Sequence, residues 1–340
     1  MNGDAASTPP VRYTETADGM RIAYVVAGQG HPVVVLPFHQ NHIERRWIAR
    51  GLTSRLAAHF RVTTYDSRGQ GLSSRSLNRV TPADYRADLE AVLQAAGLDS
   101  AVIVAYGGFA HVALRYAADN PGRVEALVLI CTCESFSAWP LGGMVTLAEE
   151  NWELFLELLV AKTAPERKEA IKAAVRKSTT AADYVLLVKA FASSSVADLL
   201  SQVRHPVLVL HSLDQHWLSV EEGTSFAAKI PGARLVFLNG DIEPSEVEGT
   251  RAVRSFLAEL GIQPVEADSP QARFTATDYH LTERQTQVLR LIAQGKTNRE
   301  IAGTLVLSER TVERHIADAY AKVGARNRVE AAAVVRRLLK

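Results

Sequence analysis

Hydrophobic residues in the first 260 positions follow two alternating patterns. Short continuous apolar runs, typical of buried strands, occur at Val33–Pro37, Arg61–Tyr65, Ala101–Ala105, Ala126–Cys131, Val207–His211 and Arg234–Leu238. Between them lie amphipathic stretches with helical spacing, such as Pro82–Ala96 and Ala110–Asn120. Continuous apolar strands separated by amphipathic helices predict an α/β fold, in which helices cover both faces of a mostly parallel sheet.

Two segments depart from this alternation. Val11–Thr16 and Met20–Ala27 flank the dipeptide Asp18-Gly19, a hairpin signal that predicts an antiparallel edge. Within about residues 134–202 the strand pattern gives way to helical spacing. The spacing is clearest in Ala148–Ala161 and Pro165–Lys177. We expect this insertion to form a helical cap over one end of the sheet.

The last 60 residues have only helical patterns and form a separate block. Residues 263–279 carry Pro264 and Pro270 without a sustained period, so we predict a linker between a domain at 1–262 and a domain at 280–340. Four helices are delimited by capping residues: Thr282 to Gly295, Thr297 to Leu305, Ser308 to Gly324, and a last helix from Asn327. A short helix, a tight turn and a second helix form the arrangement that inserts its second helix into the DNA major groove.

The charge distribution supports this division. The whole chain has 38 Lys and Arg against 37 Asp and Glu, a net charge of +1. Residues 281–340 contain 12 basic and 6 acidic residues, and subtraction leaves 26 and 31 in the first 280. The net charges are therefore +6 and −5. Because phosphate binding needs local positive charge, the basic block is compatible with nucleic acid.

A series of fixed offsets in the C-terminal block identifies its resemblance. The offsets are Leu281-Thr282-x-Arg284, Val288-Leu289, Gly295, Asn298-x-Glu300-Ile301-Ala302, Leu305, Ser308-x-x-Thr311-Val312-x-x-His315 and Lys322-x-Gly324-x-Arg326-Asn327-Arg328. This segment resembles the LuxR-type helix-turn-helix over its whole length. The resemblance implies that the third helix reads operator DNA and that the fourth mediates dimerisation.

Individual roles follow by position from that resemblance. Arg310 and Arg314 lie one turn apart on the third helix and are the candidates for reading bases, since guanidinium groups pair with guanine O6 and N7. Candidates for contacts with the DNA backbone are Thr297, Ser308, Thr311 and Lys322. One position departs from the family pattern, because Glu313 replaces a frequent lysine. Two interpretations remain: Glu313 loses a phosphate contact, or it reads a cytosine amino group.

The N-terminal domain carries a second resemblance. Tyr65-Asp66-x-Arg68-Gly69-x-Gly71-x-Ser73 is similar to a hallmark of the α/β-hydrolase fold. The similarity extends over about residues 11–260. His42-x-Glu44 and Trp47 are similar to the hydrolase-like domains that are joined to bacterial signalling and DNA-binding modules. The resemblance implies a catalytic triad whose nucleophile lies on a strained strand-to-helix elbow, G-x-S-x-G.

The triad positions lack suitable side chains. The elbow reads Ala105–Phe109 and places Gly107 where the nucleophile belongs, so no atom is present to attack a carbonyl. Residues 239–244, where the base belongs, contain no histidine. The degenerate positions are Gly107, Gln215 or, with a one-residue slip, Asp214, and Glu243. Because triad members act as a unit, we predict that the domain is not an enzyme.

A ligand crevice is still expected where the strands end beneath the cap. The expected lining residues are Phe38, His39, His42, Tyr106, Gly107, Phe109, Trp139 and Asp241. Each aromatic residue among them is equally compatible with the core. Cys131-x-Cys133 has no second cysteine pair, so we expect no metal and no cofactor.

These observations predict a homodimeric transcription regulator whose hydrolase-like domain senses a small molecule and controls operator binding. Two alternatives remain: an esterase or lactonase with a non-standard site fused to a DNA-binding domain, and a ligand-free dimerisation scaffold. The N-terminus lacks a signal-peptide pattern, no apolar run approaches the ~20 residues of a membrane span, and there are only two cysteines. We therefore expect a cytoplasmic protein without a membrane partner.

Overall fold

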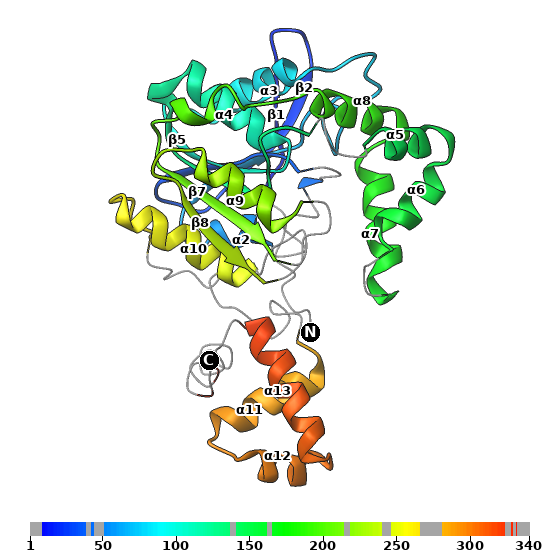
Figure 1. Ribbon diagram of the computed structural model, residues 1–340, viewed down its shortest axis with the longest axis vertical. Helices are drawn as coiled ribbons and strands as arrows, with labels where there is room; N and C mark the ends of the chain where they lie inside the picture. The colour runs from blue at the N-terminus through cyan, green and yellow to red at the C-terminus, as the bar shows by residue number, and fades with distance from the viewer. Residues whose placement is uncertain are drawn as a thin grey trace. The chain divides into compact units, whose positions relative to one another are not determined.

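The structure is a computed structural model that describes most of the chain (Figure 1). The described residues are 9–38, 42–43, 51–136, 141–161, 165–213, 218–239, 246–265 and 281–323, with Arg328 and Ala331. The chain divides into two compact units, residues 1–244 with 252–265, and residues 245–251 with 266–340. The predicted linker lies almost wholly outside the described residues, so the domain boundaries stay a prediction.

Within the described residues of the first unit, eight strands form one sheet (Figure 1). They are β1 (Arg12–Glu15), β2 (Arg21–Ala27), β3 (Pro32–Val35), β4 (Arg61–Tyr65), β5 (Ala101–Tyr106), β6 (Val124–Ile130), β7 (Val207–Ser212) and β8 (Arg234–Leu238). Their order is β1-β2-β4-β3-β5-β6-β7-β8. The β1–β2 and β2–β4 pairs are antiparallel, and all other pairs are parallel. The predicted mostly parallel sheet with an antiparallel edge is confirmed.

Helices cover both faces of this sheet because its strands are apolar on both sides. In β5, Val102 and Val104 pack toward α2 (Leu52–Leu56) and α10 (Glu246–Glu259). Ile103, between those two valines, packs into the opposite layer. That layer contains α3 (Pro82–Ala95), α4 (Phe109–Asp119) and α9 (Val220–Ala228). Short 3₁₀ turns at η1 (Pro121–Arg123) and η2 (Leu200–Gln202) precede β6 and β7.

The described residues of the helical insertion between β6 and β7 form four helices. They are α5 (Leu141–Glu150), α6 (Trp152–Leu159), α7 (Pro165–Ser178) and α8 (Ala181–Ala192). The predicted helical insertion is confirmed, and the helical spacing at Ala148–Ala161 covers the end of α5 and all of α6, which are separated at Asn151. The Asn151 side chain accepts a hydrogen bond from the Leu154 N–H at 3.0 Å and so starts α6, a preferred role of asparagine.

The second unit contains α11 (Glu283–Ala293), α12 (Asn298–Leu305) and α13 (Glu309–Val323). Thr282 and Thr297 cap the first two helices, as predicted. The core of the unit comprises Val288, Leu289, Ile292, Ile301, Ala302, Val312, Ala319 and Ala331. The predicted fourth helix lies outside the described residues except for Arg328 and Ala331. In neither unit does a described helix have the length and apolarity that a membrane crossing requires.

Candidate functional site

A tight strand-to-helix turn lies at the carboxyl end of the central strand β5. Gly107 follows β5 directly and has φ of 49°. Its N–H donates to the Ile130 carbonyl at 2.9 Å, and its carbonyl accepts from the Thr132 hydroxyl at 3.0 Å. A positive φ at this position is the strained conformation of a nucleophile elbow, which glycine adopts without strain. The first unit therefore has an elbow whose central residue lacks a side chain.

The position after Gly107 is closed by the cap. A Cβ atom at Gly108 would lie 2.5 Å from a ring carbon of Phe191 in α8. The next side chain, Phe109, is fully buried, and its ring centroid lies 5.2 Å from that of Tyr85 and 5.0 Å from that of Phe191. Phe109 thus packs in an aromatic cluster of the core. A side chain at position 108 would require movement of the cap helix.

Two of the predicted pocket residues come together beside the elbow. The rings of Phe38, just after β3, and Tyr106, at the end of β5, meet edge to face with centroids 5.5 Å apart. Both side chains are partly exposed, whereas His42 is buried. The remaining candidates lie outside the described residues: His39, Trp139, Asp214, Gln215, Asp241 and Glu243. The Phe38–Tyr106 pair and Gly107 are thus the described part of the candidate ligand site.

Two buried histidines lie near this edge of the sheet. His111, in the first turn of α4, contacts the Cys133 carbonyl through Nε2 at 2.8 Å and the Ser194 hydroxyl through Nδ1 at 2.7 Å. Burial lowers its pKa to about 4, so the ring is neutral at pH 7. Burial also lowers the pKa of His211, whose ring lies against Gly223 of α9. Sequence reasoning missed His111, whose only signal is a polar residue within the apolar first turn of α4.

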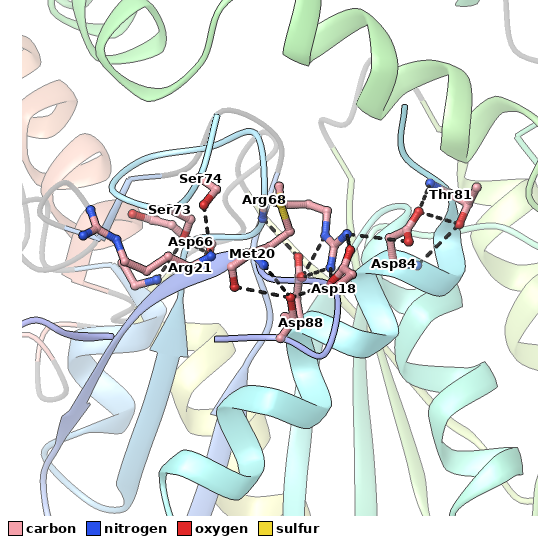
Figure 2. Close-up of polar contacts among 12 residues, drawn as sticks. Asp18, Met20, Arg21, Asp66, Arg68, Ser73, Ser74, Thr81, Asp84 and Asp88 are labelled. Atoms are coloured by element: carbon pink, nitrogen blue, oxygen red, sulfur yellow. Dashed lines mark hydrogen bonds and ion pairs between the residues drawn. The ribbon is translucent and has the colours of Figure 1, made fainter. Parts of the chain in front are cut away.

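A charged network fixes the loop that follows β4 (Figure 2). The buried Arg68 guanidinium donates to Asp88 at 2.8 Å and to Asp18 at 2.7 Å, and its backbone N–H donates to Asp88 at 3.0 Å. Burial raises the pKa of Asp88 to about 6, whereas the hydrogen bond from Arg68 lowers the pKa of Asp18 to about 2. Sequence reasoning recognised Arg68 as part of a motif but missed both partners. The network joins the β1–β2 hairpin, this loop and α3.

The same loop holds the base of the cap. Asp183 in α8 accepts hydrogen bonds from the N–H groups of Ser76 and Leu77 at 3.0 and 2.8 Å. The Thr179 hydroxyl donates to the Gly69 carbonyl at 3.0 Å. Hydrogen bonds between cap side chains and backbone groups of this loop therefore hold the cap on this side.

In the second unit, α13 presents a charged face. Val312 and Ala319 are buried against α11 and α12, and they turn the opposite side of the helix to solvent. The exposed residues on that side are Glu309, Arg310, Glu313, Arg314, Ala317 and Asp318. The structure therefore brings the two predicted base-reading arginines, Arg310 and Arg314, onto one exposed face at the start of the helix.

The predicted backbone-contact residues lie at helix starts. The Thr297 hydroxyl accepts from the Glu300 N–H at 3.3 Å, and the Ser308 hydroxyl accepts from the Thr311 N–H at 3.1 Å. Both hydroxyls therefore act as caps at the first turns of α12 and α13. Lys322 lies in the last turn of α13, and its side chain is outside the described residues.

Comparison with known proteins agrees with both resemblances. Residues 279–335 match the model of "Bacterial regulatory proteins, luxR family", and residues 41–149 match that of the "alpha/beta hydrolase fold". Spore germination protein GerE of Bacillus subtilis is 45% identical over 51 residues, which are 15% of this chain and 69% of GerE. This chain belongs to the LuxR family of bacterial regulatory proteins. Its C-terminal unit contains the helix-turn-helix domain of that family.

Other relatives share only part of their length with this LuxR-family chain. The uncharacterized transcriptional regulatory protein YhcZ of Bacillus subtilis is 35% identical over 101 residues, which are 27% of this chain and 45% of YhcZ.

A crystal structure of a hydrolase from Pseudomonas aeruginosa PA01 superposes with a TM-score of 0.63 at 25% identity, covering 74% of this chain and 99% of the hydrolase. The first unit thus has the α/β-hydrolase fold.

The predicted absence of a metal stays a prediction. Among the described residues no group of three or more His, Cys, Asp or Glu side chains is arranged to hold an ion. Cys131 and Cys133 are buried and are not joined by a disulfide, and burial raises the pKa of Cys133 to about 12. This LuxR-family member therefore has, within its described part, a hydrolase-type elbow without a nucleophile and an exposed helix face that carries both arginines and acidic residues.

Proposed function

We propose that this protein is a one-component transcription regulator. Its hydrolase-like unit binds a small molecule without catalysing a reaction, and its helix-turn-helix unit binds operator DNA as a homodimer. The observation that carries the proposal is Gly107, which keeps the geometry of the elbow but has no side chain. Ligand binding would shift the population of conformations that are competent for DNA binding.

The ligand half of the proposal rests on the carboxyl edge of the sheet. Open α/β sheets bind ligands where parallel strands end. The partly exposed rings of Phe38 and Tyr106 offer an apolar contact beside Gly107, at the place where an acyl group meets the nucleophile of an active hydrolase. We therefore propose a small ligand of ester or lactone type, bound with its apolar part against these rings.

The DNA half rests on α13 and on the family to which the chain belongs. A dimer places two such helices in successive major grooves about 34–36 Å apart. Operator binding also places the protein in the cytoplasm, with the chromosome. Like the homodimer, this location is part of the proposal.

The DNA-binding proposal predicts separable effects of two substitutions in the full-length chain. The double change Arg310→Ala and Arg314→Ala should remove selectivity for the operator while weaker binding to other DNA persists. Lys322→Ala should weaken binding to all sequences alike and lower the salt dependence. Electrophoretic mobility shifts on promoter fragments measure both effects. Unchanged operator affinity in the double variant would reject the assignment of α13 as the recognition helix.

The ligand proposal predicts thermal stabilisation of the first unit. All four tryptophans precede residue 218, so tryptophan fluorescence reports the unfolding of this unit alone. A panel of esters and lactones should contain compounds that raise the melting temperature, because a ligand that binds only the folded state stabilises it. The shift should disappear in Tyr106→Ala and persist in Tyr13→Ala, which changes an exposed tyrosine on β1. If no compound stabilises the wild-type chain, the dimerisation-scaffold alternative is favoured.

The hydrolase alternative predicts turnover by the wild-type chain. We expect no hydrolysis of the same esters and lactones, because Gly107 supplies no nucleophile. Gly107→Ser restores a hydroxyl at the elbow and serves as the comparison. Wild-type hydrolysis that is abolished by Asp214→Ala or His216→Ala would contradict the proposal and favour a non-standard active site.

A further inference from the structure

The first four charges on the exposed face of α13 are arranged in two rows, and the exposed Asp318 follows them one turn after Arg314. Glu309 and Glu313 form one row, defined here as the Glu row, and Arg310 and Arg314 form the Arg row. Residues four apart on a helix are neighbours, with Cβ atoms about 5–6 Å apart. Each row therefore places like charges side by side, and like-charged pairs at this spacing destabilise a helix. An arrangement that stabilised the isolated helix would alternate the signs.

The described part of the chain offers these four charges no partner. All four side chains are exposed, and none takes part in an ion pair or a side-chain hydrogen bond among the described residues. Glu313 lies three residues after Arg310, a spacing at which ion pairs form, yet the two are not paired. The face is therefore open to an external ligand that carries both hydrogen-bond donors and acceptors.

The helix dipole accounts for the negative charge of Glu309 but not for that of Glu313. Glu309 is the first residue of α13, where a negative charge is favourable because of the helix dipole. Glu313 lies one turn further, beyond that favourable position, and has another glutamate on its N-terminal side. Neither helix stability nor general attraction to DNA accounts for a carboxylate at position 313, since phosphates repel it.

We propose that Glu313 is a specificity-determining residue that accepts a hydrogen bond from a cytosine N4 amino group in the operator, while the Arg row reads guanine. The inference rests on the proposed DNA-binding function. In the major groove, guanine presents the acceptors O6 and N7, and cytosine presents the N4 donor. An Arg row beside a Glu row offers the complementary donors and acceptors. This choice decides between the two interpretations of Glu313 that the sequence left open.

The spacing of the rows fits stacked base pairs. Side chains one helical turn apart are separated by about 5–6 Å, and base pairs are stacked about 3.4 Å apart. Members of one row therefore face positions up to two base-pair steps apart. Glu313 lies between Arg310 and Arg314 along the chain, so we expect its cytosine next to, or opposite, a guanine read by the Arg row. The operator half-site should contain adjacent G·C pairs.

Selection of bound duplexes from a random DNA pool tests this inference with the full-length chain. The wild type should enrich a motif with adjacent G·C pairs. Glu313→Met keeps roughly the length of the side chain but removes the carboxylate oxygens, and it should reduce the preference for cytosine at one position by about 5- to 150-fold. Glu283→Met is the matched control, because it makes the same replacement at an exposed position at the start of α11 and should leave the motif unchanged.

A cytosine analogue measures the contact itself. Replacing the selected cytosine by 2-pyrimidinone removes the N4 amino group, and binding by the wild type should fall by about 5- to 150-fold more than binding by Glu313→Met, which has no carboxylate to accept from that group. Both proteins meet the same weakened base pair, so the difference isolates the contact. Equal losses in the two proteins, or a uniform rise in affinity of Glu313→Met for all sequences, would overturn the inference. A wild-type chain that enriches no motif would instead contradict the proposed function.

Discussion

The buried network around Arg68 allows a quantitative test of how the first unit is held together (Figure 2). Arg68→Met keeps most of the apolar stem but removes the guanidinium group. Asp88 is fully buried and then loses its cationic partner. Breaking a buried ion pair from one side costs about 3–5 kcal/mol, because the remaining charge is uncompensated. That is a large part of the about 5–15 kcal/mol that stabilises a typical domain.

Urea unfolding followed by tryptophan fluorescence measures this loss. Arg115→Met is the matched control, since the Arg115–Asp198 pair is partly exposed, with side-chain exposures of 34% and 60%. Exposed pairs contribute about 1 kcal/mol or less. The reasoning predicts a clearly larger loss at pH 7.5 for Arg68→Met than for Arg115→Met.

The loss should also depend on pH with a defined sign. Folding raises the pKa of Asp88 from 3.8 to about 6, so the contribution of this group to stability is greatest below pH 3.8 and falls as the pH rises through 6. Without Arg68 the pKa rises further, and the folded variant keeps the neutral acid to higher pH. The deficit of Arg68→Met should therefore be smallest near pH 5 and grow above pH 6. A deficit that is independent of pH, or no larger than that of Arg115→Met, would refute the argument.

Three further outcomes are expected. Val306 has φ of 54°, in the left-handed region that asparagine tolerates better than valine, and its side chain is 89% exposed. Val306→Asn should therefore stabilise the second unit by about 1 kcal/mol and slow hydrogen exchange in α12 and α13. Unchanged exchange would contradict this. A Cβ atom at Gly30 would collide with the Val265 side chain, so Gly30→Ala should accelerate proteolytic cleavage after residue 262. Gly232 also has a positive φ but has open space around it, so Gly232→Ala should not change the cleavage rate. Equal cleavage rates in the two variants would refute the contact between Gly30 and Val265. Folding lowers the pKa of His111 from 6.5 to about 4, so stability should fall as the pH drops through this range. Urea unfolding should show a smaller fall in His111→Gln, in which other groups with lowered pKa, such as His211, still contribute.

Local patterns in the sequence were sufficient for most of the fold. Continuous apolar runs predicted β3 to β8 within a few residues, and the Asp18-Gly19 hairpin predicted the antiparallel edge, because strand pattern and turn chemistry are local properties. The helix starts at Thr282 and Thr297 were likewise readable, since a capping box lies within four residues. The break at Asn151 was missed because apolar spacing continues across it.

Part of the candidate site was also determined by sequence alone. Gly107 lacks a side chain in any conformation, and Arg310 and Arg314 share a helix face because of helical periodicity. Tertiary structure decided what surrounds these positions. Gly108 is closed by Phe191, 83 residues away, and Arg68 is paired with Asp88 on another element. Such partners depend on how elements pack across the core, and no local periodicity encodes that packing.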